Sequence, residues 1–162
     1  LIVAIARGGL TIAQLLSDQL ELPIAVFTVE SYKNLKQEKL PHITYGLAAK
    51  LKDKKVLLVD DVCDTGKTFL RALRYLQKLG VKQADIKTLS LHYKPHAAFK
   101  PDFFAQETSA WVIYPYEVKE TIMQLAPIWL KEGLTILQIK NRLARLKLPE
   151  KQVETFLKKD IL

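Results

Sequence analysis

The sequence has a single cysteine and no long apolar run. Cys63 alone cannot form an intrachain disulfide, which fits a reducing compartment, so we expect a cytoplasmic protein. No stretch of about 18 consecutive apolar residues is present, and the sequence therefore predicts no membrane span. Internal repeats and low-complexity segments are also absent. The 49% hydrophobic and 26% charged residues are typical of a globular protein rather than a disordered one.

An initiating methionine is lacking as well. Leu1–Ala6 is apolar, but it has neither the basic flank nor the cleavage pattern of a signal peptide. It has the composition of a core strand entered midway, so we expect that an N-terminal piece precedes it. The 162 residues suffice for one ordinary α/β domain and a small appendage, and not for two full domains.

Acidic residues are outnumbered, which gives a formal net charge of +8. Such an excess suits either a nucleic-acid surface or a site for a polyanionic small molecule. Residues 133–162 hold seven Lys or Arg and three Asp or Glu, a steeper excess per residue than in residues 1–132. If nucleic acid binds, we expect it to bind through this basic tail, although a lid or dimerisation element is the favoured account of the tail.

Strand-like and helix-like segments alternate over most of the chain. We expect strands at Leu1–Ala6, Pro23–Val29, Lys55–Val59, Ile86–Tyr93 and Trp111–Tyr114, helices at Thr11–Leu20 and Lys67–Leu79, an exposed loop at Glu30–Pro41 and a turn at Asp60–Gly66. This order predicts an α/β fold with a central, mainly parallel sheet flanked by helices. Later segments have a helical period, so we expect a core over residues 1–118 and a small helical C-terminal extension over residues 119–162.

The segment from Val56 to Thr68 is the most informative part of the chain. An apolar strand leads to two adjacent carboxylates, Asp60 and Asp61, and a helix then opens at Gly66. Backbone N–H groups and the positive end of the helix dipole bind anions at such a position. A nucleotide-triphosphate P-loop needs a glycine where this chain has Asp61, whose carboxylate would repel a triphosphate. The turn instead suits one phosphate monoester beside sugar hydroxyls, and an ordinary capped turn is the less favoured alternative.

This segment resembles the binding motif for 5-phosphoribosyl-1-pyrophosphate (PRPP) in type I phosphoribosyltransferases. Its Asp64–Thr68 ending is similar to the hypoxanthine/xanthine-guanine branch. The resemblance covers residues 1 to about 118 and implies the type I phosphoribosyltransferase fold, a Mg²⁺ cofactor, PRPP and a 6-oxopurine base as substrates, and a homo-oligomer. The PRPP-binding residues that it implies are Arg7, Gly8, Asp60, Asp61, Asp64, Thr65, Gly66, Lys67 and Thr68.

Other positions match the same family. Ala6-Arg7-Gly8-Gly9 looks like its pyrophosphate loop, in which the Ala6–Arg7 peptide is often cis in relatives. Lys94 corresponds to the lysine that donates to the purine 6-oxo group, because a lysine offers only donors. Trp111 corresponds to the aromatic residue that stacks on the base, and the Val112 backbone to the groups that read its edge. On the residues alone, Lys94 could be a solvated lysine and Trp111 a core residue.

The resemblance also implies a catalytic and a metal-binding residue. Asp64 matches the general base that faces the purine's imidazole nitrogen, and Glu117 matches an acidic residue that holds Mg²⁺ through water. Ser31 and Tyr32 would open the mobile hood that closes over PRPP, unless the segment is an ordinary charged loop. The three histidines, His42, His92 and His96, lack metal-ligand spacing and receive no role.

The resulting hypothesis is a 6-oxopurine phosphoribosyltransferase of purine salvage, a glycosyltransferase (pentosyltransferase). The alternative from another class is a PRPP-sensing transcription regulator with the same fold and a basic helical tail. Orotate transfer is a further enzymatic alternative, and Lys67 and the Trp111 segment disfavour it.

Overall fold

The computed structural model describes residues 1–33, 36–48 and 50–160. The chain divides into two compact units, Leu1–Ser109 and Ala110–Leu162, which are described here one at a time. The structural division falls after Ser109, whereas the sequence placed the boundary after Val118. The physical reason is that residues 110–117 form no part of the sheet, whose last strand has already ended.

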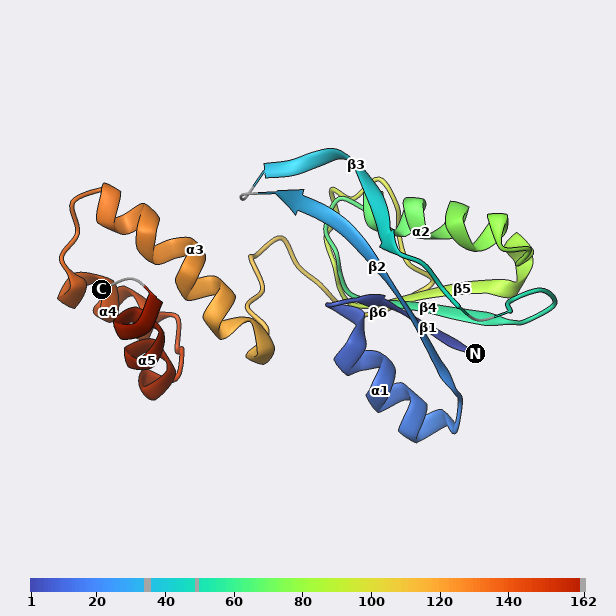
Figure 1. Ribbon diagram of the computed structural model, residues 1–162, viewed down its shortest axis with the longest axis horizontal. Coiled ribbons are helices and arrows are strands. Elements are labelled where there is room, and N and C mark those ends of the chain that lie inside the picture. The colour runs from blue at the N-terminus through green and yellow to red at the C-terminus, as the bar shows by residue number, and fades with distance from the viewer. Residues whose placement is uncertain (34–35, 49, 161–162) are drawn as a thin grey trace. The chain divides into compact units, whose positions relative to one another are not determined.

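The first unit is a six-stranded sheet with the order β3-β2-β1-β4-β5-β6. Its strands are β1 (Ile2–Ala6), β2 (Ile24–Lys33), β3 (Lys36–Tyr45), β4 (Val56–Cys63), β5 (Ile86–Tyr93) and β6 (Phe103–Glu107). Neighbouring strands are parallel except for the β2–β3 pair. Helix α1 (Gly9–Leu20) packs on one face and α2 (Lys67–Lys78) on the other, while a short 3-10 turn, η1 (Gln83–Asp85), precedes β5 (Figure 1). The predicted α/β architecture is confirmed.

Alternation along β1 explains why both faces of the sheet are covered. Ile2 and Ala4 pack with the α1 residues Ile12 and Ala13. Val3 and Ile5 belong instead to the cluster that contains the α2 residues Phe69, Ala72, Leu73 and Leu76. Because successive side chains point to opposite faces, a strand that is apolar at every position must be covered on both sides.

Two of the predicted elements are wrong. The exposed loop expected at Glu30–Pro41 contains the end of β2 and most of β3, paired antiparallel with Glu30 opposite His42. Its polar, lysine-rich composition gave no strand pattern, because main-chain pairing in a hairpin does not require apolar side chains. The strand expected at Trp111–Tyr114 is not a strand, and the edge of the sheet is β6 instead. Aromatic and β-branched residues favour strands only where a neighbouring strand is available to pair with them.

A third difference concerns the end of β4. The sequence placed Asp60 and Asp61 in a turn, but β4 continues to Cys63. The reason is the parallel pairing with β5, in which Asp60 lies opposite Ser90 and Cys63 opposite Tyr93. The two carboxylates are therefore held by the sheet itself and not by a turn.

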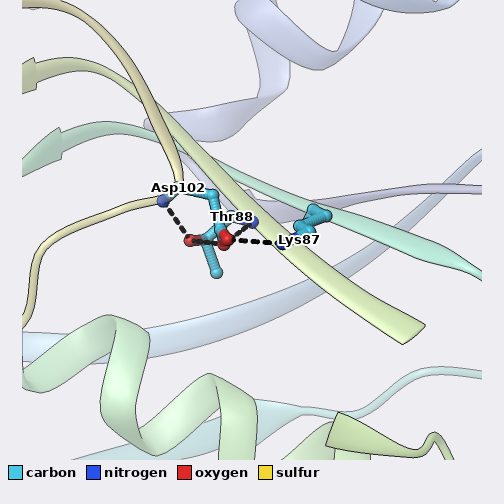
Figure 2. Close-up of polar contacts among 3 residues, drawn as sticks. All are labelled: Lys87, Thr88 and Asp102. Atoms are coloured by element: carbon cyan, nitrogen blue, oxygen red, sulfur yellow. Dashed lines mark hydrogen bonds and ion pairs between the residues drawn. The ribbon is translucent and has the colours of Figure 1, made fainter. Parts of the chain in front are cut away.

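Besides its parallel pairing with β5, strand β6 is preceded by a side chain, Asp102, that binds β5 (Figure 2). Its Oδ2 accepts hydrogen bonds from the backbone N of Thr88 at 2.9 Å and from Thr88 Oγ1 at 2.7 Å. Its Oδ1 lies 2.9 Å from Lys87 Nζ, and its own backbone N donates to Thr88 Oγ1 at 2.9 Å. This network anchors the start of the edge strand.

The second unit starts with an irregular segment and the 3-10 helix η2 (Pro115–Glu117), followed by α3 (Val118–Lys131), α4 (Ile136–Arg145) and α5 (Glu150–Asp160). Thr135 caps α4, since its Oγ1 accepts from Gln138 N at 3.3 Å and its backbone N donates to Gln138 Oε1 at 2.8 Å. The three helices bury their own cluster, which comprises Val118, Ile122, Ala126, Ile139, Leu143, Leu148, Val153 and Leu157. Among the described residues, no helix has the length and apolar character needed to cross a membrane.

Candidate active site

Three motifs follow three neighbouring strands of the sheet. Arg7 and Gly8 come after β1, Asp64–Thr68 after β4, and Lys94 after β5. Because β1, β4 and β5 are adjacent and parallel, the segments that follow them emerge at the same edge of the sheet. Ligands of open α/β sheets bind at this edge.

The Arg7–Gly8 loop lies directly against the acidic end of β4. The Ala6–Arg7 peptide bond is cis, as the resemblance implied. A Cβ atom built on Gly8 would lie 2.4 Å from Asp61 Oδ1 and 2.6 Å from Asp61 Oδ2. Only glycine allows such a close approach, so the structure joins two motifs that the sequence separates by about fifty residues.

The carboxylates of Asp60 and Asp61 are buried, with 8% and 6% of each residue exposed. The backbone N of Asp61 donates to Asp60 Oδ1 at 3.0 Å. Burial, together with the neighbouring charge of Asp61, raises the pKa of Asp60 well above its ordinary value, although that hydrogen bond acts in the opposite direction. Such a pair favours a ligand that donates hydrogen bonds, as sugar hydroxyls do.

Gly66 determines how the chain enters α2. Its φ of +79° lies in the left-handed region, and a Cβ atom there would come within 2.7 Å of the backbone N of Phe99. Gly66 occupies the N-cap position of α2 and has no side chain with which to cap it. The positive end of the helix is thereby presented at the turn that the sequence assigned to a phosphate.

Asp64 meets two basic side chains from the segment that follows β5. Its Oδ1 lies 3.9 Å from Lys94 Nζ and 3.2 Å from His96 Nε2. The Lys94 side chain is 9% exposed, so the solvated-lysine alternative is wrong. The family pattern had given Lys94 and Asp64 separate roles toward the base, and His96 had received no role. The sequence places His96 two residues after Lys94, and this was the one signal that could have pointed to it. The sequence alone does not show that the segment after β5 folds back over Asp64.

Cys63 is the last residue of β4 and is buried. Its Sγ lies 3.2 Å from the carbonyl oxygen of Phe99. Burial and the negative charges of Asp60 and Asp64 raise the pKa of Cys63 to about 12. The thiol is therefore a packing group and not a nucleophile.

Trp111, Val112 and Glu117 belong to the second unit and are described within it. Trp111 is 70% exposed and is not part of the buried cluster of the second unit. Val112 is half-buried, and Glu117 Oε2 accepts a hydrogen bond from the backbone N of Tyr114 at 3.2 Å in the cap of η2. Their roles toward a base and a metal ion stay predictions.

The remaining predictions concern the metal ion and the hood. Within residues 1–33, 36–48 and 50–160, no cluster of three or more His, Cys, Asp or Glu residues could hold a metal ion. The carboxylate oxygens of this edge nevertheless fit a Mg²⁺ ion whose other ligands come from substrate oxygens. Ser31 and Tyr32 lie in β2, and their side chains fall outside the described part of the structure.

The fold and this edge define an α/β protein with two candidate anion-binding loops beside a buried acidic pair. Comparison with known proteins agrees, because residues 1–121 match the phosphoribosyl transferase domain. The chain belongs to the phosphoribosyl transferase domain family.

The relatives include phosphoribosyltransferases and a transcriptional regulator. The chain is 29% identical over 125 residues to the hypoxanthine-guanine phosphoribosyltransferase of Schistosoma mansoni, covering 69% of this chain and 44% of that protein. It is 28% identical over 78 residues to the transcriptional regulator GfcR of Methanococcus vannielii, covering 48% and 38%. The crystal structure of a purine phosphoribosyltransferase from Pyrococcus horikoshii is 40% identical with a TM-score of 0.62, covering 71% and 74%. The chain spans less than half the length of these two curated relatives.

Proposed function

We propose that this protein transfers ribose 5-phosphate from PRPP to a 6-oxopurine base (hypoxanthine, guanine or xanthine) and releases pyrophosphate. The observation that carries the proposal is the pairing of Asp64 with Lys94 at the carboxyl ends of β4 and β5. This pairing supplies a proton acceptor and a buried donor beside a phosphate-binding turn. Names of relatives that act on hypoxanthine, guanine and other purines support the same assignment.

Lys94 selects the class of base. An ammonium group has three donors and no acceptor, so it stabilises an oxo group at position 6 and disfavours the amino group of adenine. Its side chain is almost fully buried, which makes an unmatched partner more costly than it would be in water. Trp111 would stack on the base, and the Val112 backbone would read its edge.

PRPP would lie across the two loops. Arg7 and Gly8 would bind the pyrophosphate, and residues 64–68 the 5-phosphate, where the hydroxyls of Thr65 and Thr68 and the Lys67 ammonium add donors. Asp60 and Asp61 would accept hydrogen bonds from the ribose hydroxyls. Glu117 would hold a Mg²⁺ ion through water, and the chemistry that such an ion would supply is neutralisation of charge on the pyrophosphate.

Asp64 would act as the general base. The bond between the anomeric carbon and the pyrophosphate oxygen breaks as the base nitrogen bonds to that carbon, and Asp64 takes the proton of the purine's imidazole ring. We propose further that Ser31 and Tyr32 open a hood that keeps water from the reacting carbon, and that the protein is a homo-oligomer.

Replacement of Asp64 tests this assignment. Asp64→Asn keeps the size of the side chain but removes the proton acceptor, so we expect turnover to fall about 10²–10⁴-fold with little change in the PRPP dissociation constant. Steady-state release of pyrophosphate measures the first quantity and isothermal titration the second. Unchanged turnover in this variant would rule out Asp64 as the base.

Substrate identity is tested with a panel of hypoxanthine, guanine, xanthine, adenine and orotate. Each base is incubated with PRPP and Mg²⁺ while pyrophosphate release is followed. We expect release with at least one of the first three bases and none with adenine or orotate. Release with adenine alone would refute the role given to Lys94.

A PRPP-sensing regulator is the second candidate, because the sequence is also similar to a transcriptional regulator. Residues 136–147 contain four basic residues and no acidic one. Two of these four are matched locally, however, since Lys140 Nζ lies 3.3 Å from Glu154 and Arg142 lies 3.7 Å from Glu132. Partly neutralised cations are a weak basis for phosphate contacts, so the enzymatic function is favoured.

Gel-shift titration at physiological salt separates the two candidates. Deleting residues 133–162 would expose the shared core of the second unit, so charge reversal is the cleaner perturbation. Arg145→Glu combined with Lys147→Glu changes two exposed side chains. Specific binding of duplex DNA by the wild type, abolished in this variant, would favour the regulator.

A further inference from the structure

His96 lies at the candidate general base although the function proposed above does not use it. Its Nε2 is 3.2 Å from Asp64 Oδ1, closer than the 3.9 Å that separates Lys94 Nζ from the same oxygen. The His96 side chain is 58% exposed and that of Asp64 is 29% exposed. Such a partly exposed contact persists in solution only if the two residues are held close together.

Main-chain hydrogen bonds hold the segments of His96 and Asp64 together. Lys94 N donates to Cys63 O at 3.0 Å, and Ala98 N donates to Thr65 O at 3.0 Å. These two bonds attach the segment that contains His96 to the segment that contains Asp64, on either side of the contact between the two side chains. Ala97 N also donates to Lys94 O at 2.9 Å, which closes a turn around His96. The imidazole is therefore brought to Asp64 by the backbone and not by a long, mobile side chain.

Lys94 and His96 differ in what they can do for Asp64. Lys94 is buried and, under the proposed function, its ammonium turns toward the oxo group of the base. His96 has no role toward the base in that function, and its side chain is more exposed than that of Lys94. When a base is bound, His96 stays beside Oδ1 and resists rotation of the carboxylate.

We propose that His96 is a positioning residue that fixes the Asp64 carboxylate for proton transfer from the purine. This inference rests on the proposed function. A misplaced catalytic group loses rate steeply with distance, and about 10²-fold is the upper range for displacements near 1 Å. Since the contact is partly exposed, we expect a loss of roughly tenfold in kcat for His96→Ala.

The test compares His96→Ala, His96→Gln and His96→Asn with the wild type. The glutamine amide nitrogen reaches the place of Nε2, whereas the shorter asparagine amide mimics Nδ1 and does not reach Asp64. We expect His96→Gln to regain most of kcat and His96→Asn to behave like alanine, with the KM for PRPP unchanged in all three. Melting temperatures close to that of the wild type are expected because the side chain is largely exposed.

A double-mutant cycle shows whether His96 acts through Asp64. In the Asp64→Asn background, His96→Ala is expected to cause no further loss of turnover. An equal loss in both backgrounds, or full activity of His96→Ala in the wild-type background, would overturn the proposal. Both outcomes differ from failure of the proposed function, which appears as a wild-type protein that releases no pyrophosphate with any of the five bases.

Discussion

The contact between Gly8 and Asp61 gives a sharp test of the site. Gly8 has φ −54° and ψ −45°, a conformation that alanine adopts without strain. The methyl group of Gly8→Ala would lie 2.4 Å from Asp61 Oδ1, so the carboxylate must move by about 1 Å to reach a normal contact distance. The substitution therefore acts on one buried side chain and leaves the backbone unstrained.

The expected effect follows from what Asp61 would lose. Each hydrogen bond between a ribose hydroxyl and a charged carboxylate contributes about 1.5–3 kcal/mol. Losing one of them weakens PRPP binding by about 2 kcal/mol, which corresponds to roughly 30-fold in the dissociation constant. The unfolding free energy should change by less, because the lower chain entropy of alanine in the unfolded state offsets part of the crowding by about 0.4–1 kcal/mol.

Isothermal titration of PRPP in the presence of Mg²⁺ measures the effect, with urea denaturation as the stability control. Gly133→Ala is a control for backbone strain alone, since Gly133 has a φ of +85°, which alanine rarely adopts, and nothing lies within 4 Å of the added atom. The Asp61→Ala and Gly8→Ala/Asp61→Ala variants complete a double-mutant cycle, in which Gly8→Ala should have no effect once the carboxylate is gone. A PRPP dissociation constant within twofold of wild type for Gly8→Ala, with Asp61→Ala clearly weakened, would refute this reasoning.

Two further predictions concern Cys63 and Asp102. With a pKa of about 12, only about 10⁻⁴ of the Cys63 thiol is ionised at pH 8. Iodoacetamide should therefore modify the folded protein about 10³-fold more slowly than the urea-unfolded protein, as followed over time by mass spectrometry. Modification rates within tenfold of each other would contradict the assigned burial. Burial acts to raise the pKa of Asp102, but hydrogen bonds from Lys87 and Thr88 outweigh it and lower that pKa below its ordinary value. The Asp102 contribution to stability is therefore present above the unfolded pKa of about 3.9 and is lost as pH falls through the folded pKa. Asp102→Ala leaves the buried Thr88 donors without that acceptor and should lower the free energy of unfolding by about 2 kcal/mol at pH 7, as measured by urea denaturation. This loss should become smaller below about pH 4. An equal loss at pH 3 would show that the charge of Asp102 is not the cause.

The local pattern of apolar residues was sufficient to predict much of the fold. The apolar runs of β1, β4 and β5 and the stripe of α2 predict elements close to those observed, because burial on two faces or on one helix face determines which residues are apolar. Strand segments with polar or exposed side chains were missed, because they lack an apolar pattern. The β2–β3 hairpin has polar residues where a loop was expected, and the edge strand β6 has mostly exposed ones.

The sequence by itself determined the chemistry of the site: two adjacent acids, a glycine-led helix start, an Arg-Gly-Gly loop, and a lysine after a strand. Only the tertiary structure decided which of these groups touch. Parallel pairing of β1, β4 and β5 brings Gly8 against Asp61, and it brings both Lys94 and His96 to Asp64. Residues about thirty to fifty positions apart meet because adjacent parallel strands end at the same edge. The spacing of residues in a sequence does not encode that register, and so the role proposed for His96 became visible only in the fold.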